Sequence, residues 1–222
     1  MLKQTYKRYF PRRCDFGDCG SNAFLEFPMC VDTPKNLHIE DNVIIRSLFR
    51  VINSPTENVY IKKYTVIGPD CTIVTNNHIS TVTIPQFLLV GTHVNDESKD
   101  IIIEEDVWTG TRVILLPGAH LGRGCIVGAG SIISTEIPPY SVVVGRGRII
   151  ASKFDKYGIK KHEQALYKEE EQMTDDEIAS LFEKHLNGFR TFGCEDVLDE
   201  KDIETIELQK RILRFIDPWA TK

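Results

Sequence analysis

Aromatic residues are scarce in this chain, because Phe, Trp and Tyr make up only 9% of its 222 residues although 41% are hydrophobic. No apolar run approaches the roughly 20 residues of a membrane-spanning helix, so we expect no membrane span. The 27 basic and 32 acidic residues give a net charge of −5, which argues against a nucleic-acid partner. The basic residues near the N-terminus precede no apolar segment, so no secretory signal is apparent and a cytoplasmic location is expected.

Cysteine is also sparse. The six cysteines include no C-x-x-C pair. The two nearest in sequence, Cys14 and Cys19, have no matching His or Cys pair later in the chain. A chain of this length would need more cysteines for a disulfide scaffold. We therefore expect free thiols and no metal site.

The negative charge is concentrated in the C-terminal part of the chain. Residues 155–222 contain 17 acidic and 11 basic residues, against 15 and 16 in residues 1–154. The segment reads as helical, because Thr174 and Glu177 form a capping box and apolar residues follow at helical spacing. A second helix is expected from about Asp202 to Phe215, and residues 160–172 are a candidate third.

The first 154 residues follow a six-residue step. The anchors of this step are Ile39, Ile45 and Val51, then Ile61, Ile67, Ile73 and Ile79, and finally Ile103, Thr109, Leu115, Leu121, Val127 and Ile133. Mostly small residues, including Cys71 and Cys125, lie four positions after an anchor, which predicts packing rather than catalytic roles for these thiols. The pattern predicts an all-β solenoid of short strands, three per turn, stacked about 4.8 Å apart around aliphatic ladders.

One stretch carries a family resemblance. Residues 103–133 contain Val-Trp-Thr-Gly and Gly-Ala-Gly-Ser, and Ser134-Thr-Glu-Ile-Pro-Pro-Tyr140 follows. This stretch resembles the hexapeptide-repeat acyltransferases, close to the maltose, galactoside and xenobiotic acetyltransferase branch, over roughly residues 37–150. The resemblance implies a left-handed parallel β-helix, acetyl-CoA as co-substrate and a homotrimer with active sites between subunits.

Three segments follow from the repeat and the resemblance. Residues 1–36 are expected to form an N-terminal lead-in segment. Residues 37–154 form the left-handed β-helix, with a loop insertion at about 80–100. Residues 155–222 form a C-terminal α-helical extension.

Acyl transfer to a hydroxyl needs a base, and histidine suits this task. Among six histidines, His78 follows Asn76 and Asn77 and precedes a 23-residue break in the repeat. A break in a solenoid makes a loop, where catalytic residues are common. The family's catalytic histidine occupies the equivalent place, so His78 is interpreted as the general base. His93, on the loop, is the second candidate, and Asn76, Asn77 and His93 are expected to contact the acceptor.

The resemblance also suggests where acetyl-CoA lies. A backbone N–H at Thr111 is expected to stabilise the oxyanion, and Trp108 to line the acyl or acceptor pocket. The remaining coenzyme-binding candidates are Gly110, Gly128, Ala129, Ser134, Arg146, Arg148 and Lys153. The glycines leave room for the pantetheine arm, and the three cations replace a phosphate-binding lysine of the relatives that this chain lacks.

The preferred function is acetylation of a sugar or glycan-precursor hydroxyl, and three alternatives stay open. A xenobiotic acetyltransferase is suggested by Ser80-Thr81 and Pro85-Gln86-Phe87. A hydratase of the γ-carbonic-anhydrase type would need two histidines five residues apart, which the chain lacks. The third alternative is a non-catalytic trimeric scaffold.

Overall fold

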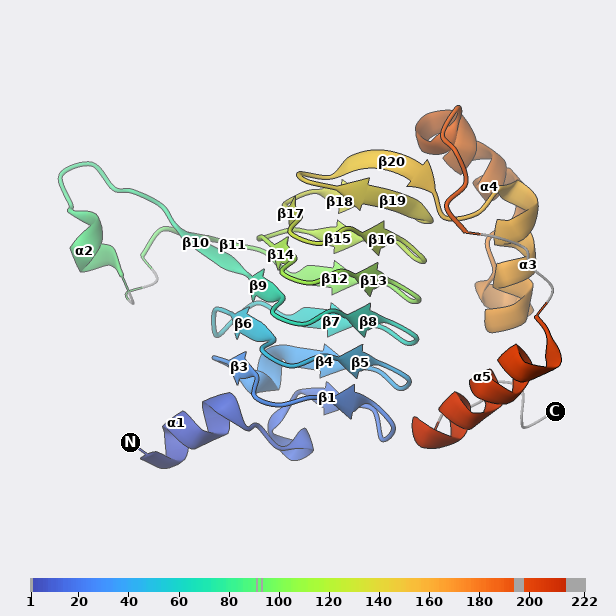
Figure 1. Ribbon diagram of the computed structural model, residues 1–222. Helices are drawn as coiled ribbons and strands as arrows, with labels where there is room; N and C mark the ends of the chain where they lie inside the picture. Colours follow the sequence, from blue (N-terminus) through green and yellow to red (C-terminus); the bar gives the residue numbers. More distant parts are fainter. Residues whose placement is uncertain (1, 91, 93, 194–197, 215–222) are drawn as a thin grey trace.

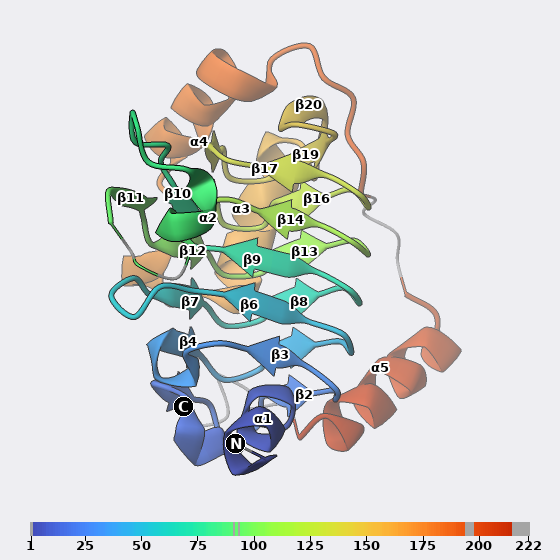
Figure 2. The ribbon, with the colours of Figure 1, turned by 90° about the vertical axis from the view of Figure 1, so that its left-hand side faces the viewer.

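The computed structural model describes residues 2–90, 92, 94–193 and 198–214. Its main body is a coil of short strands, and each full turn contributes one strand to each of three sheets (Figures 1 and 2). Strands of successive turns pair in parallel, as in Ile39 beside Ile61 and Ile61 beside Ile103. The predicted left-handed parallel β-helix is confirmed.

The three sheets form the sides of the coil. Sheet A contains β1 (Asp18–Cys19), β4 (Leu37–Ile39), β7 (Val59–Ile61), β12 (Ile101–Ile103), β15 (His120–Leu121) and β18 (Glu136–Ile137). Sheet B contains β2 (Phe24–Leu25), β5 (Ile44–Ile45), β8 (Val66–Ile67), β13 (Trp108–Thr109), β16 (Ile126–Val127), β19 (Ser141–Val144) and β20 (Arg148–Ser152). Sheet C contains β3 (Cys30–Val31), β6 (Arg50–Ile52), β9 (Thr72–Val74), β14 (Ile114–Leu115) and β17 (Ile132–Ile133).

The six-residue step determines which side chains fill the interior. Twelve of the thirteen predicted anchors are at most 2% exposed. Thr109 is one of them, and its hydroxyl accepts a hydrogen bond from the Gly68 N–H at 3.2 Å, so this polar anchor fits the ladder. The exception is Ile79, which is 46% exposed because the chain has left the coil before this residue. The prediction of Ile79 as an anchor is therefore wrong.

The coil begins one turn before residue 37, the predicted start of the β-helix. Strands β1, β2 and β3 pair in parallel with β4, β5 and β6. They lie within residues 1–36, which were expected to be a lead-in segment. Cys19, Leu25 and Val31 repeat the six-residue step, so the signal was present in the sequence. Helix α1 (Leu2–Tyr9) precedes this first turn and lies beside β3.

The C-terminal extension is helical, as its pattern predicts. It contains α3 (Lys156–Leu166), a short 3₁₀ helix (Glu169–Glu171), α4 (Asp175–Leu181), a π-helical turn (Phe182–Leu186) and α5 (Glu200–Ile212). Thr174 and Glu177 form the predicted capping box. Strand β20 turns back antiparallel to β19 and leads into α3, which runs beside the coil (Figure 1). The extension therefore covers the last turn and one edge of the solenoid.

Asp106 joins α3 to the coil. Its carboxylate accepts hydrogen bonds from the Lys153 ammonium at 2.5 Å and from the His162 ring at 2.9 Å. Burial alone would raise the pKa of Asp106, but His162 and Lys153 outweigh it and lower that pKa below its ordinary value. The charged carboxylate is thus the form that the folded protein favours.

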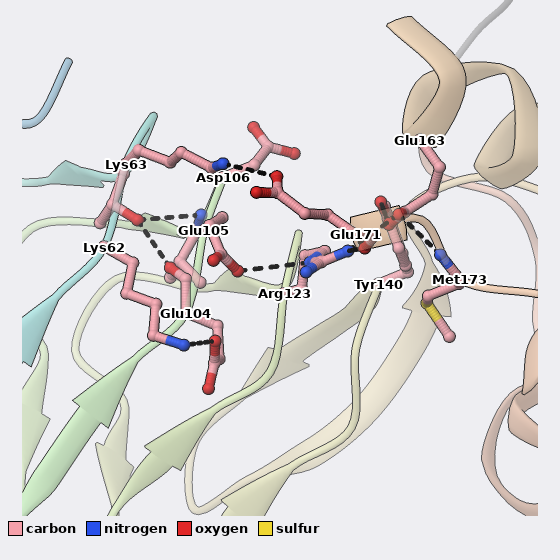
Figure 3. A network of polar contacts seen from close by, with 12 residues as sticks. Lys62, Lys63, Glu104, Glu105, Asp106, Arg123, Tyr140, Glu163, Glu171 and Met173 are labelled. Carbon is pink, nitrogen blue, oxygen red and sulfur yellow. Dashed lines mark hydrogen bonds and ion pairs between the residues drawn. The ribbon is translucent and has the colours of Figure 1, made fainter. Parts of the chain in front are cut away.

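A second set of polar contacts continues along the same edge (Figure 3). The Arg123 guanidinium donates to Glu105 at 3.3 Å and to the buried Glu163 at 2.9 Å, and lies 4.3 Å from the centre of the Tyr167 ring. The Tyr140 hydroxyl donates to the other Glu163 oxygen. Burial and the neighbouring Glu163 raise the pKa of Tyr140, so this hydroxyl stays protonated. These contacts neutralise the charge that α3 buries against the coil.

The Asp106 contacts predict an acid-dependent loss of stability. Because its pKa is lowered, the contribution of Asp106 is complete above about pH 4 and is lost as the pH falls through the lowered value. Replacement Asp106→Asn should reduce the free energy of unfolding at pH 7 by about 1.5–3 kcal/mol, measured by urea denaturation. The difference from wild type should shrink on acidification.

Asp70→Asn is the matched control, since Asp70 also has a positive φ but forms an exposed pair with Arg112. It should change the unfolding free energy by less than about 1 kcal/mol. Equal effects of the two substitutions would contradict the role given to Asp106.

Candidate active site

A two-stranded hairpin leaves the coil after β9. It consists of β10 (Asn76–His78) and β11 (Asp96–Ser98), joined by a loop that contains the short helix α2 (Gln86–Leu89). Its strands are antiparallel, whereas those of the coil are parallel. Figure 1 shows the hairpin projecting away from the stacked strands. The break in the repeat therefore forms a loop, and it begins at Asn76 rather than at about residue 80.

His78 lies on the first strand of this hairpin. Its side chain is 30% exposed, and its Nδ1 atom lies 2.7 Å from Oδ1 of Asp96. The Asp96 side chain is only 6% exposed. The Asn76 amide donates to the other Asp96 oxygen at 3.2 Å. The histidine predicted to be the base is thus held by a largely buried carboxylate.

The other predicted acceptor contacts are placed differently. Asn77 lies opposite Glu97 in the hairpin and is exposed. Because side chains alternate along a strand, Asn77 points away from the face that carries His78. His93 lies outside the described residues.

A second group of predicted residues lies at the corner between sheets B and C. Trp108 on β13 is 49% exposed on the outer face of sheet B. The Thr111 hydroxyl donates to the Pro69 carbonyl at 2.8 Å. Within the part of the chain that the structure describes, no group accepts a hydrogen bond from the Thr111 N–H. That donor is the one expected at the oxyanion.

The glycines at this corner have a packing cause. A Cβ on Gly68 would lie 2.6 Å from the Gly110 carbonyl oxygen, and one on Gly110 would lie 2.6 Å from the Ala129 nitrogen. A Cβ on Gly128 would lie 2.9 Å from the Val144 side chain. Adjacent turns are therefore too close here for any side chain. The result is a column of backbone with no side chain at Gly68, Gly110 and Gly128, which ends at Val144 in the next turn.

The expected coenzyme cations separate into two places. Arg146 is exposed on the turn between β19 and β20, and Arg148 is exposed as the first residue of β20. In this turn the Gly145 carbonyl accepts a hydrogen bond from the Ile132 N–H. Lys153 lies at the edge that α3 covers, 13% exposed and paired with Asp106. Ser134 is exposed just after β17, at the end of sheet C. The structure therefore brings Arg146 and Arg148 to the glycine corner, and it engages Lys153 elsewhere.

The hairpin and the glycine corner lie apart within one chain. Both views show β10 and β11 on the opposite side of the coil from β13 (Figures 1 and 2). Sheet C separates them, because in the turn that carries the hairpin the chain passes from the glycine corner through β9 of sheet C before it reaches β10. A single copy thus carries two parts of the predicted site without joining them.

Residues 100–135 match the family model described as "Bacterial transferase hexapeptide (six repeats)". The galactoside O-acetyltransferase of Lactococcus lactis is 27% identical over 149 residues, 67% of this chain and 68% of that protein. The galactoside O-acetyltransferase of Escherichia coli is 29% identical over 59% of this chain and 60% of that protein. A Vibrio cholerae hexapeptide-repeat acetyltransferase, solved with acetyl coenzyme A, has a TM-score of 0.56 at 26% identity, over 67% of this chain and 77% of that one.

These matches confirm the resemblance of this chain to the hexapeptide-repeat acetyltransferases.

Asp96 is the member of this hexapeptide-repeat site that sequence reasoning missed. It closes the segment Gly91-Thr-His-Val-Asn-Asp96, which has no periodic pattern. Its place follows from the antiparallel register of the hairpin, which the six-residue step does not encode. A polar strand that ends a break in the repeat was the available signal.

The two thiols predicted to have packing roles lie in the interior of the coil. Cys71 and Cys125 are 3% and 0% exposed, and burial raises the pKa of both thiols, which disfavours a thiolate nucleophile. Among the described residues, no group of three or more His, Cys, Asp or Glu side chains is arranged to hold a metal ion. Within the same residues, no helix has the length and apolar character needed to cross a bilayer.

Proposed function

We propose that this protein is an acetyl-CoA-dependent O-acetyltransferase that acetylates a hydroxyl of a sugar or glycan precursor, with His78 as the general base. The observation that carries the proposal is His78 itself, held against a buried carboxylate on the hairpin that interrupts the coil. The galactoside O-acetyltransferases among its relatives support the reaction class and the choice of a sugar. The acetyl-coenzyme-A complex of the V. cholerae acetyltransferase supports the co-substrate.

The chemistry follows from the two parts of the site. His78 accepts the proton of the acceptor hydroxyl as its oxygen attacks the thioester carbonyl. The Thr111 N–H donates to the carbonyl oxygen as negative charge develops there, an effect often worth a few kcal/mol of the barrier. When the carbon–sulfur bond breaks, His78 returns the proton to the departing sulfur. The products are the acetyl ester and the free thiol of CoA.

A homotrimer supplies the geometry that one copy lacks. The hairpin of one subunit would meet the glycine corner of its neighbour, so that His78 and Thr111 face the same substrates. The loop that follows His78 supports this arrangement, because Val82 and Phe87 are each 87% exposed and Val90 is 65% exposed. A loop with this much exposed apolar surface is typical of an interface, and the proposed partner is a second copy of the chain.

The exposed corner accommodates the coenzyme. A column of backbone without side chains suits a pantetheine arm that runs along the coil, with Trp108 beside the acyl end. In this proposal Arg146 and Arg148, at the last turn of the coil, hold the 3′-phosphate.

His78→Ala tests the base. Thiol release from acetyl-CoA should be measured over a panel of sugars, nucleotide sugars and antibiotics. We expect turnover with a sugar acceptor, and a loss in kcat of about 100-fold or more in His78→Ala, with CoA binding by calorimetry unchanged. His185→Ala is the matched control, since His185 is exposed on the C-terminal extension. Equal turnover by His78→Ala would contradict the assigned base, and acetylation of antibiotics alone would favour a xenobiotic enzyme.

The molar mass of the assembly in solution tests the proposed subunit contact. Light scattering should give three times the 25.3 kDa of the chain. Phe87→Asp should shift the population toward smaller species on dilution, because burying a carboxylate at the contact is unfavourable. Leu208→Asp, on the exposed face of α5, should leave the mass unchanged. A wild-type monomer would rule out the arrangement.

The two arginines are tested with a truncated co-substrate. The double variant Arg146→Gln, Arg148→Gln should raise the KM for acetyl-CoA by about 10-fold or more, since each charge-assisted contact contributes roughly 1.5–3 kcal/mol. The KM for 3′-dephospho-acetyl-CoA should change far less. Arg211→Gln, at an exposed arginine on α5, is the control. An equal rise in both KM values would show that the arginines do not hold the 3′-phosphate.

A further inference from the structure

We propose that Asp96 is a positioning residue for His78, fixing the proton on Nδ1 so that Nε2 acts as the base. This inference rests on the proposed function, because it assigns Asp96 a part in the same reaction. It concerns a residue from the far strand of the hairpin, 18 positions after the histidine.

The hairpin register places the two residues together. Asp96 lies directly opposite His78 in the antiparallel ladder, and Asn76 lies opposite Ser98. Residues opposite one another in such a ladder carry their side chains on the same face. The Nδ1 to Oδ1 distance of 2.7 Å is that of a strong hydrogen bond between a ring N–H and a carboxylate.

The carboxylate is held from a second side. The Asn76 amide donates to Oδ2 of Asp96 at 3.2 Å. Asn76 precedes His78 by two residues, so both side chains lie on the face that carries Asp96. Asn76, expected from the sequence to contact the acceptor, is therefore assigned here to the support of Asp96.

This arrangement has a chemical consequence. A carboxylate accepts hydrogen bonds but cannot donate one, so the facing Nδ1 must carry the proton in the neutral ring. The lone pair then lies on Nε2, where it can receive the acceptor proton. The negative charge of Asp96 also stabilises the imidazolium that forms during the transfer, as the aspartate of a serine-protease triad does.

Burial argues against a purely structural pairing. The backbone ladder already joins the two strands, and leaving a carboxylate only 6% exposed is costly unless a partner compensates. The adjacent Glu97 shows the alternative, since it lies on the other face and forms an exposed pair with Lys99 at 3.3 Å. An exposed ion pair such as Glu97 with Lys99 would be enough if the hairpin needed only stabilisation.

The test compares Asp96→Asn with Glu97→Gln. Each substitution removes one negative charge without changing side-chain size, and the two sites are neighbours on the same strand. For Asp96→Asn we expect kcat to fall by about 100-fold or more, a smaller loss than in the protease triad. The KM for acetyl-CoA should stay within about 2-fold, because the proposal gives Asp96 no contact with the coenzyme, and Glu97→Gln should retain wild-type values.

Nitrogen-15 spectra of histidine-labelled protein give a readout independent of turnover. The neutral His78 ring should be the Nδ1–H tautomer in wild type and in Glu97→Gln, and should lose that preference in Asp96→Asn. Asn76→Ala is a milder variant that keeps the carboxylate, and it should lower kcat by about 5-fold, the value of one hydrogen bond.

The outcomes are distinct. If Asp96→Asn keeps the wild-type kcat, or if the tautomer of His78 is the same with and without the carboxylate, the proposal is wrong. If wild-type protein transfers no acetyl group, the proposed function fails, whereas the tautomer still tests the pairing of His78 with Asp96. Should Asp96→Asn not fold, the wild-type protein still decides, because a neutral His78 ring with its proton on Nε2 would overturn the proposal.

Discussion

The stacking of turns at one fixed spacing is the constraint on which this structure depends. Each turn adds one strand to each sheet, and the inward side chains meet only if every strand holds the six-residue step. A turn without room for extra residues must expel them, so the insertion after β9 leaves the coil as a hairpin instead of widening it. The same spacing brings the backbones of neighbouring turns so close at the glycine corner that a Cβ there would clash with the next turn. The two features used by the proposed chemistry thus arise from one packing rule.

This rule also separates them. A hairpin expelled at one corner and a column of bare backbone at another cannot meet in a rigid coil, because sheet C lies between them. The proposed trimer resolves the separation by symmetry, since the hairpin of each subunit reaches the corner of the next. The C-terminal extension is attached elsewhere on the coil. It attaches through Asp106 and Arg123 at the corner between sheets A and B.

Much of the fold could be predicted because its signals are local. The aliphatic step marked the interior, the break after His78 marked the loop, and the Thr174 capping box marked a helix start. Ile79 was wrongly predicted to be an anchor, because it lies six residues after Ile73 although the chain has already left the coil. Two pairings could not be predicted from the sequence. Asp96 and His78 are 18 positions apart and meet through the register of the hairpin. Lys153 and Asp106 are 47 positions apart and meet where the C-terminal extension packs on the coil. These longer-range pairs decide which predicted site residues are available for the reaction.

Complementation between two inactive variants tests the shared site most directly. His78→Ala removes the base, and Arg146→Glu with Arg148→Glu disables the corner at low acetyl-CoA. Co-expressed in equal amounts, the two chains should form mixed trimers in which about a quarter of the sites combine a native hairpin with a native corner. Recovery of about a quarter of the wild-type turnover is the predicted result. If the mixed trimers stay as inactive as the separate variants, each site lies within one subunit and the account is wrong.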